Sequence, residues 1–178
     1  MDDVVLAAMR KWPHVPACAG WLGLDARGRW WMRNAAAQAA GPFAGPGSSA
    51  ASKGEEVRHD KLCAFIARNY THNGQGAWYF QNGPQRVYVE LEHCPWVWRL
   101  DAGPSVCSHT GQMAQPQQAW LDEAGRLYLQ CDLGLGVVHS QDMVHAIDRI
   151  DSGQWQPRSM AWADMPAYFG FLRSCTHL

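Results

Sequence analysis

The sequence predicts an α+β fold of mainly antiparallel sheet, with a β-hairpin-plus-helix unit used twice. Strands are indicated over 85–91, where Val87, Val89 and Leu91 occupy every second position. Helices are indicated over 57–69 and 140–150, where apolar residues recur at i, i+3 and i+4. The third observation is a segment that recurs 97 residues later along the chain.

The remaining elements follow from turn and stop signals. An amphipathic N-terminal helix over 2–12 ends at Pro13, and Asp25 to Gly28 has the composition of a hairpin turn within 20–32. An aromatic tail from Trp155 is expected to pack back on the body. The other expected elements are strands over 77–100, a strand over 105–114, a hairpin over 118–131 and, within the helix over 140–150, one apolar face formed by Met143, Val144, Ile147 and Ile150.

The repeat aligns Leu24–Met32 with Leu121–Leu129 without a gap, so that Gly28 falls on Gly125. A fainter third copy spans Asn73–Phe80. Chance similarity is the alternative, because D-x-x-G turns are common. We expect a single domain over 1–178, with internal repeats at about 18–100 and 105–152. The low-complexity segment 35–54, mainly Ala, Gly, Ser and Pro, is expected to be a flexible insertion.

Charge and hydropathy exclude two classes of partner. The net charge is -1, so no basic face for a nucleic acid is expected. No apolar run approaches the roughly 20 residues that span a bilayer, so no membrane partner is expected. The start Met1-Asp2-Asp3 lacks the basic residues of a signal peptide, which favours a cytoplasmic location.

Six scattered cysteines without a C-x-x-C pair favour reduced thiols, and no cofactor is predicted. His59 and Cys63 lie four apart on an expected helix and could bind a metal together with His139 or His145. The favoured interpretation is that His59 serves the helix N-terminus, that Cys63 packs inward and that no metal binds.

Ten tryptophans are the unusual feature of the composition. Adjacent strand aromatics such as Trp30 and Trp31 point to opposite sheet faces, so either both faces are covered or one carries an aromatic patch. Cover by the N-terminal helix and the aromatic tail is favoured. The alternative is a groove for a ligand or peptide, because aromatics with arginine are typical of binding hot spots. The candidate binding residues are Tyr79, Arg86, Tyr88, Trp98 and Trp31.

These features favour a non-catalytic module that binds an unknown small molecule or protein, with a regulatory role. The alternative is a small enzyme or metal-binding protein with a Cys/His centre, for which Cys107 and His109 on one strand face are a candidate pair. A homodimer formed through an exposed sheet face is a third hypothesis.

Four stretches resemble an uncharacterised proteobacterial family of unknown function. They are Gly20–Gly28, His59–Tyr70, Trp78–Val89 and Pro166–Phe171. The layout is also similar to that of a second family, whose repeated hairpin–helix fold has been suggested to serve signalling or ligand binding. The resemblance implies a fold of this kind and no established activity, and the insertion at 35–54 departs from the compact family pattern.

Overall fold

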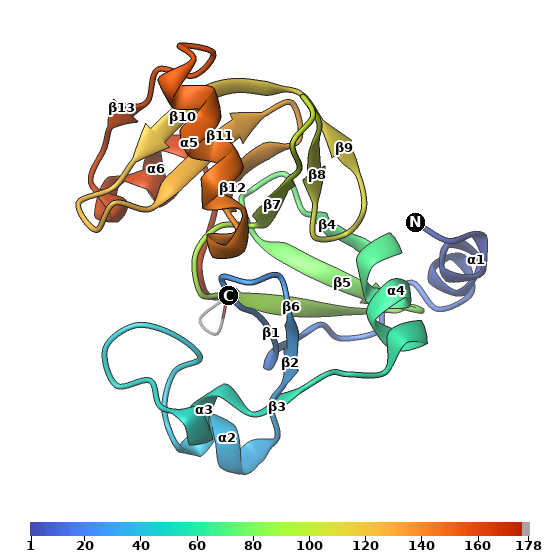
Figure 1. Cartoon of the computed structure of the whole chain (residues 1–178). Helices are drawn as coiled ribbons and strands as arrows, with labels where there is room; N and C mark the ends of the chain where they lie inside the picture. Colours follow the sequence, from blue (N-terminus) through green and yellow to red (C-terminus); the bar gives the residue numbers. More distant parts are fainter. Residues whose placement is uncertain (176–178) are drawn as a thin grey trace. The chain divides into compact units, whose positions relative to one another are not determined.

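The computed structural model describes residues 1–175 and confirms the α+β class, with two sheets and several helices (Figure 1). The chain divides into two compact units. Of the described residues, the first unit comprises 1–25, 29–92 and 171–175, and the second comprises 26–28 and 93–170. No helix in the described part of the chain combines the length and the hydropathy that crossing a membrane requires.

The first unit holds a six-stranded sheet in the order β3-β2-β1-β6-β5-β4. Strands β1 and β6 pair in parallel, and the other neighbours pair antiparallel. The strands are β1 (Cys18–Leu24), β2 (Trp30–Met32), β3 (Glu55–Glu56), β4 (Tyr70–His72), β5 (Trp78–Asn82) and β6 (Gln85–Leu91), and the helices are α1 (Asp3–Lys11), α2 (Ala35–Ala39), α3 (Ala50–Lys53) and α4 (Asp60–Arg68).

The second unit holds a seven-stranded sheet in the order β13-β10-β11-β12-β7-β8-β9. Its parallel pairs are β7 with β12 and β10 with β13. The strands are β7 (Trp96–Leu100), β8 (Val106–Ser108), β9 (Met113–Ala114), β10 (Pro116–Leu121), β11 (Leu127–Cys131), β12 (Gly134–Val138) and β13 (Arg158–Ser159), and the helices are η1 (Ser140–Asp142), α5 (Met143–Asp151), η2 (Trp162–Asp164) and α6 (Met165–Phe169).

Both sheets contain the same five-strand pattern. A hairpin is followed by a three-strand meander, and the last meander strand returns in parallel beside the first hairpin strand. The pattern is β2-β1-β6-β5-β4 in the first unit and β8-β7-β12-β11-β10 in the second. Strand β7, which falls inside the expected repeat at 18–100, therefore belongs to the second sheet. By topology, β10–β11 corresponds to β4–β5 and not to β1–β2.

The three sequence copies share one turn geometry. The side chains of Asp25, Asn73 and Asp122 each accept a hydrogen bond from the backbone N–H four residues later, at 2.9, 3.1 and 2.8 Å. The backbone N–H of each of these residues also donates to the carbonyl four residues later. Because every bond joins residues at most four apart, the motif forms in any hairpin that carries the sequence. The similarity between the copies therefore indicates that they form the same turn, and it does not indicate that their strands occupy the same place in a sheet.

Helix α4 and segment 35–54 pack on the two faces of the first sheet. Helix α4 packs on one face, where Phe65 and Phe80 make an edge-to-face contact at 5.4 Å. Segment 35–54 packs on the other, and the ring of Phe43 lies so close to Gly23 that no side chain fits there. This segment contains α2 and α3, although its flexibility stays a prediction. The aromatic tail is divided between the units. Phe169 contacts Trp120 at 5.8 Å in the second unit, whereas Phe171 is buried in the first unit and the backbone N–H of Leu172 donates to the Gly76 carbonyl at 2.9 Å.

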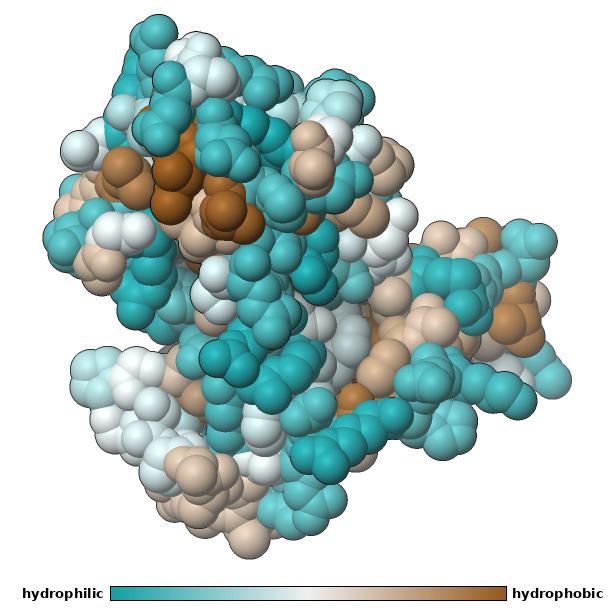
Figure 2. Space-filling model, in the orientation of Figure 1, coloured by the Kyte–Doolittle hydropathy of each residue, from teal (hydrophilic) through white to brown (hydrophobic). Residues whose placement is uncertain are grey.

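Helix α5 buries a different face from the one expected. Ala146 and Arg149 are buried, whereas Val144 and Ile147 are 58% and 49% exposed. Figure 2 shows hydrophobic surface over the position of this helix. Arg149 explains the rotation, because its guanidinium donates to the carbonyls of the β7–β8 loop and stacks on Trp155 at 4.9 Å. The hydrogen bonds of Arg149 therefore set which face of α5 is buried, in place of the apolar face that the periodicity indicates.

Acid is expected to destabilise the second unit below about pH 4. Burial alone would raise the pKa of Asp122, but hydrogen bonds from Arg126, Tyr128 and Ala124 outweigh it and hold that pKa below its usual value. Asp142 likewise has a lowered pKa, because bonds from Arg99 and the Leu100 N–H outweigh its burial. A carboxylate with a lowered folded-state pKa stabilises at neutral pH and loses this contribution as pH falls through that pKa.

Urea unfolding at a series of pH values measures this effect. The midpoint should stay level from neutral pH to about pH 5 and fall below about pH 4. A midpoint that rises on acidification would contradict the assignment of these two carboxylates.

Candidate functional site

A cavity of about 480 Å³ lies in the first unit between α4 and the sheet that it covers. Strand alternation places Phe80 and Val87, which face each other across β5 and β6, on this side of the sheet. Helix α4 contributes Leu62 and Ile66 from its apolar face. The cavity is lined by Cys18, Trp21, Leu22, Met32, Leu62, Ile66, Phe80, Asn82, Gln85 and Val87.

The cavity exists because α4 covers only part of this face. The helix has nine residues and is therefore only about 13 Å long. A register shift in the β1–β6 pairing between Cys18 and Leu22 interrupts the regular alternation of β1, and Trp21 and its neighbour Leu22 both reach the cavity. Trp21 and Met32 are 46% and 50% exposed, whereas Leu22 and Ile66 are buried at 3% and 1%. The site therefore has an apolar floor and an open, adaptable rim.

No lining residue of this cavity carries a charge at neutral pH. Burial raises the pKa of the Cys18 thiol, which keeps it protonated. Asn82 and Gln85 supply amides, and the Gln85 side chain donates to the Pro16 carbonyl at 3.1 Å. A thiol and two amides can orient a ligand by hydrogen bonds, but they cannot offset a ligand charge. The chemistry of the site thus suits an uncharged molecule with a large apolar part.

Three of the expected binding residues come together on the opposite face of the same sheet. The rings of Tyr79 and Tyr88 lie 6.1 Å apart in an edge-to-face arrangement. The guanidinium of Arg86 lies over the Tyr79 ring at 5.0 Å. Tyr79 is 6% exposed, so only Arg86 and part of Tyr88 offer contact surface. Binding by this cluster stays a prediction.

Trp31 and Trp98 do not join that cluster. Trp31 donates its indole N–H to Asp25 at 2.9 Å, and Lys53 lies over its ring at 5.2 Å. Trp98 belongs to the second unit, is fully buried and donates to the Leu129 carbonyl at 2.8 Å. Trp98 lies on β7 in the second sheet and Tyr79 on β5 in the first, and their part in binding stays a prediction.

His59 and Cys63 serve local structure. The Nδ1 of His59 accepts a hydrogen bond from the Leu62 N–H at 3.3 Å and caps α4. The thiol of Cys63 donates to the Val57 carbonyl at 3.1 Å. Within residues 1–175, no group of three His, Cys, Asp or Glu side chains could hold a metal ion.

Sequence reasoning missed the cavity residues Trp21 and Met32 as site residues. The available signal was that Trp21 and Leu22 are adjacent apolar residues in one strand, which regular alternation would place on opposite faces. Their meeting at one cavity depends on the shift in the β1–β6 register, which no local pattern reveals.

Comparisons with known proteins agree with a family of unknown function. The family model DUF2944, described as "Protein of unknown function (DUF2946)", matches residues 1–174. The structure of a DUF1285 family protein from Silicibacter pomeroyi DSS-3 is similar, with a TM-score of 0.48 and 11% identity over 83% of this chain and 85% of that chain. No curated protein matches the sequence.

Proposed function

Since the chain belongs to the DUF2944 family, whose function is unknown, we propose from its own geometry that the first unit binds a small, uncharged, largely apolar molecule. The ligand lies in the cavity between α4 and the sheet, and the protein acts as a non-catalytic, regulatory binding module. The observation that carries this proposal is a cavity of about 480 Å³ with a buried apolar floor and a few neutral polar groups. Ligand sites in proteins typically span roughly 300–1,000 Å³ and combine an apolar lining with a few polar groups.

The exposed rim supports a role in binding. Trp21 and Met32 leave apolar surface in water, which is unfavourable in the empty protein and is relieved when a ligand covers it. Met32 is flexible and can adapt its side chain to ligands of different shape. The six free cysteines are consistent with a cytoplasmic protein, and that location remains our expectation.

Replacing Val87 with phenylalanine is expected to abolish ligand binding at this site. Val87 is half-buried and lines the cavity, so a ring at this position fills the space that a ligand needs. The probe is N-phenylnaphthylamine, a neutral apolar fluorophore with one N–H. We expect saturable fluorescence enhancement with the unmodified protein and at least about tenfold weaker binding to the variant.

The matched control is Val4→Phe, the same change at a 71% exposed position of α1 that does not line the cavity. It should leave probe affinity unchanged. As a second readout, bound probe should slow alkylation of Cys18, followed by peptide mapping, without slowing that of Cys63. Equal probe affinity for Val87→Phe and the unmodified protein, with no protection of Cys18, would overturn the proposal.

A further inference from the structure

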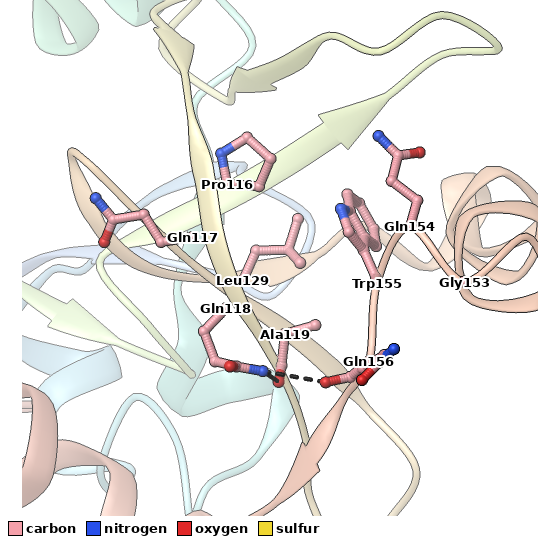
Figure 3. A pocket seen from close by; sticks show the side chains of 9 residues that line it. All are labelled: Pro116, Gln117, Gln118, Ala119, Leu129, Gly153, Gln154, Trp155 and Gln156. Carbon is pink, nitrogen blue, oxygen red and sulfur yellow. Dashed lines mark hydrogen bonds between the residues drawn. The ribbon is translucent and has the colours of Figure 1, made fainter.

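A second cavity, of about 360 Å³, lies in the second unit beside the outer edge of β10 (Figure 3). Strand β13 pairs with β10 only at Trp120 and Leu121. The preceding residues of β10 therefore border the cavity where a neighbouring strand would otherwise lie. The opposite wall is the segment that follows α5, and the lining residues are Pro116, Gln117, Gln118, Ala119, Leu129, Gly153, Gln154, Trp155 and Gln156.

The floor of this cavity is apolar and rigidly held. Ala119, Leu129 and Trp155 are buried, with 4%, 0% and 8% exposure. The backbone N–H of Trp155 donates to the Arg149 carbonyl at 3.0 Å, and the Arg149 guanidinium lies over the indole at 4.9 Å. Figure 3 shows the indole nitrogen on the side of the ring that faces β10. Trp155 thus presents a fixed edge with one N–H donor.

The wall consists of four glutamines. Gln118 is structural, because its Nε2 donates to the Ala119 carbonyl at 2.8 Å and to the Gln156 carbonyl at 3.1 Å and so links the two sides of the cavity. Gln117, Gln154 and Gln156 are exposed; Gln154 and Gln156 lie on the Trp155 side, whereas the side chain of Gln117 projects from the other side of β10 (Figure 3). Each primary amide offers two donors and one acceptor oxygen. None of the nine lining residues is ionisable.

From this arrangement we propose that the second cavity binds a neutral, hydroxyl-rich molecule, a saccharide or polyol. Hydroxyl groups both donate and accept, and therefore match amides that do the same. The C–H faces of a sugar ring lie on the floor formed by Leu129, Ala119 and the Trp155 edge. A charged ligand would lose hydration without gaining a counter-charge.

A peptide strand fits this cavity less well than a compact ligand. Pro116 has no N–H to donate to an added strand. The Gln118–Gln156 link closes one end of the cavity and limits the length of anything bound along β10. The site lies in a different unit from the α4 cavity, so either proposal can fail without the other.

The test uses the isotope-labelled full chain and follows side-chain amide and indole N–H resonances by NMR. Glucose, galactose, maltose and sorbitol are titrated separately. The Gln154→Ala variant identifies the Gln154 amide signals by their loss. We expect at least one of the four compounds to shift these signals saturably. Gln154→Ala, followed through the indole signals that the same compound shifts, is expected to weaken its binding about fivefold. Gln141→Ala, an exposed glutamine on η1, is the matched control and should leave binding unchanged.

Three outcomes would overturn this proposal. The first is no saturable shift of the Gln154 signals with any of the four compounds. The second is a shift caused by a capped trialanine peptide and by no saccharide, which would identify a strand-docking edge. The third is tighter binding of glucose phosphate than of glucose, because a neutral lining gives a phosphate no advantage.

Discussion

Replacing Arg33 with methionine is expected to destabilise the first unit by about 3 kcal/mol or more. Arg33 is 3% exposed and donates to four backbone carbonyls. Its Nε bonds to Ser52 at 2.7 Å, and its terminal nitrogens reach Gly20 in β1 and two carbonyls of segment 35–54, those of Ala37 and Gly41. Methionine has a similar length but no donor, so it leaves these carbonyls buried without partners.

The physical reason for the size of this effect is desolvation. Burial lowers the pKa of Arg33, and the nearby Glu90 carboxylate acts in the opposite direction. The guanidinium stays charged there because its N–H donors, which point in fixed directions from a planar group, are paired with carbonyls. Each orphaned carbonyl costs about 1–3 kcal/mol, a large share of a total stability of about 5–15 kcal/mol. Lysine keeps the charge but cannot bond to all four carbonyls, so Arg33→Lys should lower the free energy of unfolding by less than Arg33→Met does.

Two measurements check the prediction for Arg33. Urea unfolding gives the stability, and limited proteolysis within 35–54 reports the local attachment of that segment. Arg58→Met is the matched control, because the Arg58 side chain is 82% exposed and approaches Glu56 only at 3.8 Å. If Arg33→Met had the same urea midpoint and the same rate of cleavage within 35–54 as the control, Arg33 would not hold this segment in place.

Replacing Asp122 with alanine is expected to cost about 3 kcal/mol in the second unit. The buried carboxylate of Asp122 accepts from the backbone N–H groups of Ala124 and Arg126, at 2.9 and 2.8 Å, and from the Tyr128 hydroxyl at 2.8 Å. Tyr128 is fully buried, and Trp162 stacks on its ring at 5.6 Å. Alanine would remove the shorter bond of the hydroxyl, which would keep only the 3.4 Å contact with His93 Nδ1, and would leave the turn without its acceptor.

Companion variants separate the two parts of this effect. Tyr128→Phe removes only the hydroxyl and should cost about 1 kcal/mol, since Asp122 keeps its bonds to the turn. Asp148→Ala is the matched control on the exposed face of α5 and should change stability by less than about 0.5 kcal/mol. Urea unfolding measures all three. Asp122→Ala should also lose part of the fall in stability below about pH 4. A loss for Asp122→Ala no larger than that of Asp148→Ala would contradict this assignment.

Elements held by short-range interactions were predictable from the sequence. Helices α1, α4 and α5 lie within or beside the expected ranges 2–12, 57–69 and 140–150, because apolar spacing and caps act over one or two turns. The Asp25 and Asp122 hairpins form where expected, because their turn bonds join residues four apart. The rotation of α5 was not predictable, because Arg149 is held by carbonyls more than 40 residues away in the sequence.

The candidate sites depended more on tertiary structure. Tyr79 and Tyr88 were predicted together because they face each other across one hairpin. The sequence groups Trp98 with them as an aromatic hot-spot type, and its strand β7 pairs with β12, about 40 residues away. The glutamine-lined cavity lies between β10 and residues 153–156, and no spacing in the sequence predicts that these two segments are neighbours.

The sequence by itself therefore determined the α+β class, the positions of helices α1, α4 and α5 and of the Asp25 and Asp122 hairpins, and the geometry of the turns, since these follow from interactions within a few residues. Tertiary structure decided the division into two sheets, the parallel β1–β6 and β7–β12 pairs, and the cover of the first sheet by 35–54. It also decided both cavities. Each of these features joins residues far apart in the chain, whose pairing is selected by the total burial and hydrogen bonding of the fold rather than by local pattern.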